Sequence, residues 1–313
     1  MGLGITQAPV LASVVVMPDP GENKYAHGRI LRDRIEPLIG QVYFSRECHE
    51  AYAALGFAGS PAVSNGVHLP DGPAYFTSRG SLMGQVPGQV VAAAFGVFNP
   101  AAVVPSVAFG WSITDADTIC AARHDGAVAQ LVRILGERPE GVDRAVGLMR
   151  RACAALEPNG KPLFAGAQSQ PWPGDPLGDF FNAGDQLREF RGDAHTAAWT
   201  AAGLDGPEIG IVSERFSGIP PRTYVRTRAW GVDRLDAAEA KLTEMGWLED
   251  DGLSAKGRAA REAIEVATDD QMAPALDALG DDFDELIAII TPWGHAVVAA
   301  HGYLGRVSDL TDV

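Results

Sequence analysis

Apolar residues recur at helical spacing along most of this chain, whereas alternating, strand-like stretches are few and short. In the first half, the spacing predicts helices over residues 29–44, 45–57, 115–135 and 142–156. Helical spacing returns at residue 185 and continues through most of the remaining chain. The pattern therefore predicts a mainly α protein with small β hairpins.

A Pro- and Gly-rich stretch, SQPWPGDPLG, interrupts the helical pattern and is expected to link two domains. The predicted parts are a flexible N-terminus (1–28), a helical, degenerate winged-helix-like domain (29–168), a linker (169–178), a MarR-like winged-helix domain (179–305) and a tail (306–313). The first 16 residues lack a basic segment and are too short to span a bilayer, so they predict neither a signal peptide nor an anchor. Met17 is a candidate for the true start.

Three short stretches of the first half recur in the second half in the same order. ECHEAYAALGF matches DAHTAAWTAAGL, and each ends near a glycine suited to close a helix, Gly56 or Gly203. WSITDAD matches WGVDRLD, and PLFA matches PALD. The shared order predicts an internal duplication. The alternative is that Ala-rich helices resemble one another by chance.

From Pro207 the pattern predicts helix PEIGIVSERF, helix PPRTYVRTRAW, helix RLDAAEAKLTEMGWL, hairpin LEDDGLS and a long helix from Lys256. In the third helix, Leu235, Ala238, Leu242 and Met245 share one apolar stripe. Asp251-Gly252 suits a tight turn between two short strands. This order is that of a winged helix.

The stretch LDAAEAKLTEMGWLEDDGLSAKGRAAREAIE resembles the recognition helix, wing and following helix of MarR-type regulators. More widely, stretches such as YFTSRGSLMGQVPGQVVAAAFGVFNP and ATDDQMAPALDALGDDFDELI resemble a bacterial family named for its helix-turn-helix fold, from about Arg29 to Tyr303. The resemblance implies a regulator-like protein. Its two winged-helix-like units would form a pseudo-dimer, mimicking the dimer that related regulators build from two chains.

The charge of the chain argues against tight DNA binding, because DNA is bound largely through Lys and Arg. The formal net charge is -15 and the pI is about 4.8. At 100° per residue, the outward face of the third helix comprises Asp233, Asp236, Ala240, Thr243 and Glu244. The tip of the wing comprises Glu249, Asp250 and Asp251. Neither surface contains a Lys or Arg residue. The contrary feature is Arg222, Arg226 and Arg228, which either contact phosphates or pair with the acidic helix. We expect DNA binding to be weak or absent.

Three groups of aromatic and polar residues are candidates for a small-molecule site. Tyr43, Phe44, His49 and Tyr52 share a surface if their helix is continuous. Tyr75 and Arg79 lie in an otherwise uncharged stretch, so Arg79 needs either a carboxylate partner or an anionic ligand. In RGDAHTAAW, Arg191, His195 and Trp199 are candidate contacts, and Asp193 suits a helix N-cap.

Metal, disulfide and common catalytic motifs are absent from the sequence. Cys48, Cys120 and Cys153 show neither finger nor disulfide spacing, and His295 and His301 are too far apart along a helix to form a metal pair. No phosphate loop, GxSxG or HExxH occurs. This removes the common enzyme classes, but leaves open an enzyme in which His49, Tyr43, Arg79 or His195 acts on a ligand.

These observations together predict a cytoplasmic, regulator-like winged-helix protein that binds a small organic ligand between its two halves. It would be a monomer or a homodimer, with no membrane partner, no metal and no cofactor that the sequence identifies. The alternatives are an enzyme on a repurposed winged-helix scaffold, a genuine DNA-binding regulator, and a scaffold that binds only another protein.

Overall fold

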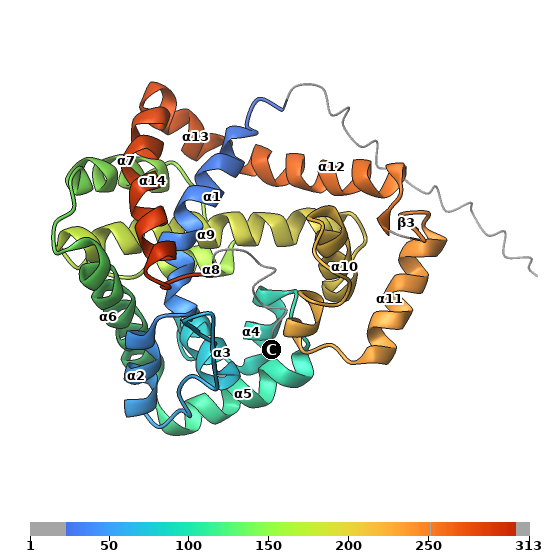
Figure 1. Cartoon of the computed structure of the whole chain (residues 1–313), viewed down its shortest axis with the longest axis horizontal. Coiled ribbons are helices and arrows are strands. Elements are labelled where there is room, and N and C mark those ends of the chain that lie inside the picture. The colour runs from blue at the N-terminus through green and yellow to red at the C-terminus, as the bar shows by residue number, and fades with distance from the viewer. Residues whose placement is uncertain (1–22, 251, 305–313) are drawn as a thin grey trace, which may run out of the picture.

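The computed structural model describes residues 23–250 and 252–304, which are mainly helical, as the sequence predicts (Figure 1). Three predicted features lie wholly or partly outside the described residues. They are the N-terminus with Met17, the wing turn at its first residue, Asp251, and the tail at 306–313. Within the described part, every helix is too short or too polar to cross a lipid bilayer.

The described elements are helices, with one short hairpin in each half of the chain. Up to residue 168 they are α1 (His27–Ile39), η1 (Gly40–Tyr43), α2 (Arg46–Ala54), β1 (Val63–Ser64), β2 (Val67–His68), α3 (Gly72–Gly80), η2 (Ser81–Met83), α4 (Gly88–Phe95), α5 (Pro100–Ile113), α6 (Ala116–Leu135), α7 (Val142–Ala154) and α8 (Pro162–Gln168). After it they are α9 (Pro176–Ala201), α10 (Gly206–Phe216), η3 (Val225–Arg228), α11 (Val232–Glu244), β3 (Leu248–Glu249), β4 (Gly252–Leu253), α12 (Ala255–Gln271), α13 (Ala273–Leu279), η4 (Gly280–Asp282) and α14 (Phe283–Ala299).

The long helix α9 lies at the centre of the molecule (Figure 1). Its N-terminal two thirds carry buried apolar residues such as Phe180 and Leu187, which belong to one large core with α1, α6 and α7. Leu276 of α13 and Trp293 of α14 complete the same core, although they follow the predicted linker in the sequence. The core therefore extends across residues 169–178, and separate folding of the two predicted domains stays a prediction.

A second, smaller core holds α10, α11, the hairpin β3–β4 and α12 against the end of α9. Leu235, Ala238 and Leu242 point into it, as the predicted stripe requires. The antiparallel hairpin pairs Leu248 with Leu253 and Glu249 with Gly252. The first and third predicted helices, the hairpin and the long helix thus follow one another as the sequence predicts, and the MarR-like winged helix itself stays a prediction.

The prediction of a helix over PPRTYVRTRAW is wrong, because within this segment only Val225–Arg228 are helical, and they form a 3-10 turn. Arg222 has a φ of 59°, which an α-helix cannot contain. The buried Glu214 carboxylate accepts hydrogen bonds from the backbone N–H groups of Arg222 (3.0 Å) and Val225 (2.6 Å). A side chain of α10 therefore stabilises the turn in place of helical hydrogen bonds.

The matched stretches of the two halves occupy partly similar places. α2 and α9 each run into a glycine with positive φ, Gly56 at 107° and Gly203 at 78°. In the first half, however, the hairpin β1–β2 precedes α3, and only Thr114 and Asp115 separate α5 from α6. The described residues of that half therefore carry no wing in the expected place, and the duplication and the pseudo-dimer stay predictions.

Candidate functional site

A cleft of about 820 Å³ lies between the two halves of the chain and is named the central cleft. Its lining includes Glu36, Tyr43, Phe44, Tyr75, Phe98, Arg188, Pro221, Arg222, Thr223, Arg226, Thr227, Arg228 and Tyr303. Tyr43, Phe44 and Tyr75, which the sequence suggests as ligand contacts, therefore meet the three arginines that it suggests as DNA contacts. The cleft combines an aromatic wall with a basic one.

Arg228 is a half-buried cation in this cleft. Its guanidinium stacks on Tyr224 at 4.1 Å and on Phe98 at 4.7 Å from the ring centroids. Its Nε is buried without a hydrogen-bond partner, and no carboxylate of the described residues lies within ion-pair distance. Arg34, Arg226 and Arg258 also show no ion pair in the described part of the chain, but they are exposed. Among the arginines of residues 23–250 and 252–304, Arg228 is therefore the one that is partly desolvated and has no carboxylate partner.

Arg222, at the edge of this wall, is neutralised within the protein. Arg222 pairs with Asp236 (2.5 Å) and Glu239 (2.7 Å), both on α11. The alternative in which this arginine pairs with the neighbouring acidic helix is thus observed for Arg222. It is not observed for Arg226 or Arg228.

The floor of the cleft is a buried ionic cluster around Glu189 of α9. Glu189 accepts two hydrogen bonds from Arg79 (2.6 and 3.0 Å) and one from Arg188 (3.1 Å). These positive charges outweigh burial and lower the pKa of Glu189 to about 2. Burial raises the pKa of Tyr43, which lies against this cluster, to about 12. Arg79 therefore has the carboxylate partner that its uncharged sequence surroundings require.

A smaller chamber of about 300 Å³ shares Glu36 and Arg188 with the cleft and extends toward α12. Arg191 and His195 of α9 line it, as does Arg79. Arg191 is already paired with Glu265 (2.8 Å) and Asp269 (3.2 Å).

His195 is held by Thr268. The Thr268 hydroxyl donates to the backbone oxygen of Ile264 (2.8 Å), so the Nδ1–H of His195 donates to Thr268 Oγ1 (3.1 Å). Burial and the nearby arginines, Arg261 first, lower the pKa of His195 to about 3. A base this weak is a poor proton acceptor near neutral pH.

The continuous helix expected to bring His49 beside Tyr43 does not form, because the chain is interrupted after Tyr43 and α2 begins at Arg46 with Ser45 as its N-cap. His49 is 5% exposed, and neither ring nitrogen has a hydrogen-bond partner. It nevertheless borders a cavity of about 10 Å³ together with Tyr43, Tyr52 and Tyr75. Burial, with a smaller contribution from His68, lowers the pKa of His49 to about 4.

Two further candidates have structural roles. Trp199 is buried in the second core, against Gly96, and lies outside the cavities described above. Asp193 is not an N-cap of its own helix, because it lies inside α9. Its carboxylate instead accepts hydrogen bonds from the backbone N–H groups of Leu163 (2.9 Å) and Phe164 (3.0 Å) at the start of α8.

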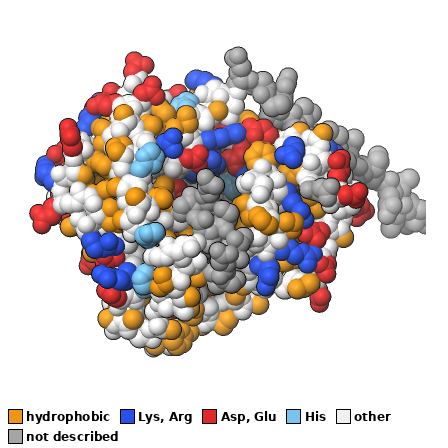
Figure 2. All heavy atoms as spheres, in the orientation of Figure 1, with side chains coloured by type: hydrophobic (Ala, Val, Ile, Leu, Met, Phe, Trp, Pro, Cys, Tyr) orange, Lys and Arg blue, Asp and Glu red, His pale blue; other side chains and the backbone are white. Residues whose placement is uncertain are grey.

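The outward face of α11 is exposed and acidic, as the helical spacing predicts. Asp233, Asp236 and Glu244 are exposed. In Figure 2, acidic side chains lie along the right-hand edge of the molecule, where Figure 1 places α11. The two basic residues that flank this face already form ion pairs within the protein, Arg234 with Asp205 and Lys241 with Glu208 (2.8 Å).

Sequence reasoning missed Glu36, Arg188, Glu189, Phe98 and Tyr303, all of which shape the cleft or its floor. Arg188 and Glu189 shortly precede the candidate Arg191, but apart from their bond to each other, their partners Glu36 and Arg79 lie more than 100 residues away. Nothing in the local pattern marks them. Among residues 23–250 and 252–304, no three His, Cys, Asp or Glu side chains come close enough together to hold a metal ion.

A helix-turn-helix family model matches residues 28–304, which is most of the chain. No curated protein and no solved structure matches the chain.

Proposed function

Because the chain belongs to this helix-turn-helix family, we propose that it is a regulator-like protein whose central cleft binds a small organic acid with an aromatic or apolar body. The observation that carries the proposal is Arg228, a half-buried guanidinium without a carboxylate partner among the described residues, facing a cleft of about 820 Å³. A ligand carboxylate would supply the missing countercharge. Tyr43, Tyr75 and Phe98 would pack against the rest of the ligand.

The place of the cleft supports a regulatory role. Arg228 belongs to the turn that leads into α11, the helix that would enter the DNA groove in a winged helix. The same turn is tied to the first half of the chain, because Asn99 bonds to the backbone oxygens of Arg228 (3.0 Å) and Ala229 (2.9 Å). A ligand between these elements would change how the turn is held, and with it the position of α11.

We propose that the cleft binds its ligand without acid–base chemistry. A general base works best with a pKa near the working pH. The pKa of His195 is lowered to about 3 and that of His49 to about 4. Tyr43 and Arg79 are held in the buried cluster around Glu189. None of these four groups is set up to move a proton at neutral pH.

Calorimetric titration tests the proposal with two probes of matched shape, 3-phenylpropanoate and 3-phenylpropan-1-ol. We expect the acid to bind and the alcohol to bind at least about tenfold more weakly, since a hydrogen bond to a charged group contributes about 1.5–3 kcal/mol. Arg228→Gln should weaken binding of the acid about tenfold to hundredfold. Arg258→Gln, which removes an exposed arginine of α12, is the control and should leave the affinity unchanged. Equal binding of acid and alcohol, or equal effects of the two variants, would contradict the proposal.

The second candidate function is that of a DNA-binding regulator, which the family and the order of α10, α11 and hairpin favour. The acidic outward face of α11 opposes it, because Asp233, Asp236 and Glu244 would face phosphates. Fluorescence anisotropy with DNA fragments from the host genome, at about 150 mM salt, separates the two. Weak binding without sequence preference fits our proposal. Tight and selective binding that Arg226→Gln abolishes would establish the DNA-binding regulator instead.

A further inference from the structure

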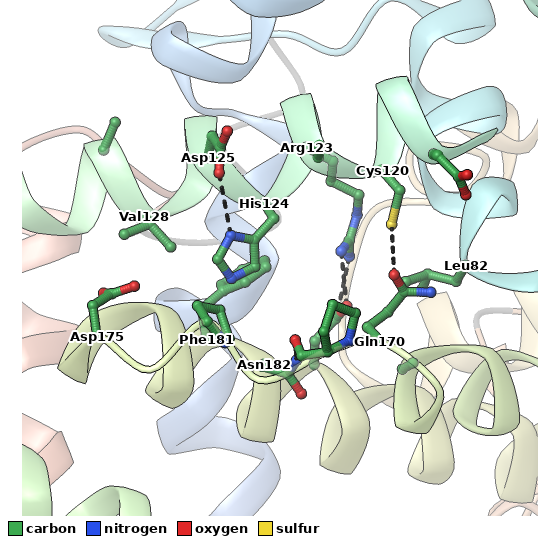
Figure 3. Close-up of a pocket in the computed structure, with 17 residues that line it drawn as sticks. Leu82, Cys120, Arg123, His124, Asp125, Val128, Gln170, Asp175, Phe181 and Asn182 are labelled. Carbon is green, nitrogen blue, oxygen red and sulfur yellow. Dashed lines mark hydrogen bonds and ion pairs between the residues drawn. The ribbon is translucent and has the colours of Figure 1, made fainter. Parts of the chain in front are cut away.

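A second cavity, of about 740 Å³, lies between α6 and the start of α9, away from the central cleft, and is named the α6–α9 cavity. Figure 3 shows α6 along one side and α9 along the other, with Leu82 and Gln170 at one end. The cavity shares no lining residue with the central cleft. Its volume is within the range of small-molecule sites, about 300–1,000 Å³.

The floor of the α6–α9 cavity is a buried and mutually neutral ion pair. Arg123, 2% exposed, donates two hydrogen bonds to Asp185 at 2.7 and 2.8 Å. In Figure 3 the Arg123 side chain extends from α6 across the floor toward α9. Its Nε is buried and has no acceptor among the described residues, although the side chain lines the cavity. The floor therefore contains an unsatisfied donor but no net charge.

The rim of the cavity is negative. Asp117, Asp125 and Asp175 line it, and none of them has a Lys or Arg partner in the described part of the chain. Asp175 also caps α9 through Gly178 N (2.7 Å), and Asp125 faces only the ring of His124 (3.5 Å). Because Arg123 and Asp185 cancel, the lining as a whole carries uncompensated negative charge.

The remaining lining is apolar, with neutral acceptors. Leu82, Val128 and Phe181 form the walls, and Pro171 and Pro173 extend them. Gln170 Oε1 accepts only a weak hydrogen bond from the Cys120 thiol (3.5 Å). An ammonium group has three donors and no acceptor, so it matches carboxylates and an amide oxygen in chemistry as well as in charge.

We propose that the α6–α9 cavity is a second ligand site, selective for an organic amine with an apolar body. The ammonium group binds at the carboxylate rim, beside Gln170, and the body packs against Phe181 and Val128. The site is independent of the central cleft, whose free charge has the opposite sign.

Cys120 provides a local readout of binding. It is half-buried in the lining of the α6–α9 cavity, whereas Cys48 and Cys153, the other two cysteines of the chain, are buried elsewhere. The rate at which methyl methanethiosulfonate, a thiol-specific reagent, converts Cys120 into a mixed disulfide, followed by peptide mass spectrometry without reduction, therefore reports on this cavity. Reaction at mildly alkaline pH compensates for burial, which raises the pKa of this thiol.

The test compares 3-phenylpropan-1-amine with 3-phenylpropan-1-ol and 3-phenylpropanoate on the full chain. We expect the amine to slow the reaction of Cys120 with methyl methanethiosulfonate and the other two compounds to leave it unchanged. Equal protection by amine and alcohol, or no protection by the amine at millimolar concentration, would overturn the proposal.

Variants test the charge and the location separately, by calorimetric titration with the amine. Asp117→Asn combined with Asp125→Asn should weaken binding about threefold to thirtyfold. Asp270→Asn, at an exposed carboxylate of α12 outside the cavity, is the control. Ala121→Phe, at an exposed position of α6 that lines the cavity, should block binding by filling it. Unchanged affinity in either the double variant or the filled variant would refute the assignment.

Discussion

At the residue scale, the informative groups are polar atoms that the protein buries without satisfying. Most arginines of the described chain have carboxylate partners, and Arg79 and Arg191 show how far along the sequence these partners can lie. Arg228 lacks such a partner and faces the central cleft. The sequence identified the residue types of the cleft but not their pairing, because pairing depends on contacts between distant segments.

His49 predicts a pH dependence of stability. Its pKa is about 4 in the folded chain and about 6.5 when unfolded, so the unfolded state binds the proton first. The stability it contributes is present above about pH 6.5 and is lost as the pH falls through about 4. Between about pH 7.5 and pH 5, the loss from this group is about 2 kcal/mol.

Urea unfolding at the two pH values checks this prediction. In His49→Leu, the decrease in unfolding free energy between them should be smaller by about 2 kcal/mol than in the parent chain. His295→Leu, at an exposed histidine of α14, should retain the parent's decrease. An unchanged pH dependence in His49→Leu would mean that this histidine already binds a proton in the folded state.

At the element scale, the apolar stripe of α11 and the paired strands of the wing follow from local spacing, and both were predictable. The turn before α11 was not. Its sequence has a helical pattern, but the carboxylate of Glu214, from the preceding helix, binds the N–H groups of Arg222 and Val225 and fixes another conformation. Such an interaction between neighbouring elements is invisible to periodicity.

Glu214→Ala should lower the unfolding free energy by about 1–3 kcal/mol per buried N–H group that loses its acceptor. Because the same turn carries Arg228, the affinity of the central cleft for 3-phenylpropanoate should fall as well. Thermal unfolding and calorimetric titration measure the two effects. Glu244→Ala, at an exposed position of α11, should change neither. An unaltered affinity in Glu214→Ala would show that the turn does not position Arg228.

At the scale of the whole molecule, the chain order does not follow the packing. The predicted linker at 169–178 lies between α8 and α9, yet α13 and α14 return to complete the core around α1, α7 and α9 (Figure 1). Composition marked the break in the helical pattern. It could not show that the last two helices pack back onto the first half, because that depends on the fold as a whole.

This packing predicts that distant core residues unfold together. Met149→Ala on α7 and Leu286→Ala on α14 should each cost about 2–5 kcal/mol. Both should shift the same transition in urea, although one residue precedes the linker and the other follows it. Two separate transitions, each sensitive to only one of these changes, would show that the predicted domains fold independently.

The most direct test of the central claim is native mass spectrometry of the full chain purified from its host. We predict a co-purifying small molecule that fragments as an organic acid and that is absent from Arg228→Gln but present in Arg258→Gln. A protein that carries only nucleic acid, or a ligand retained equally by both variants, would contradict the account.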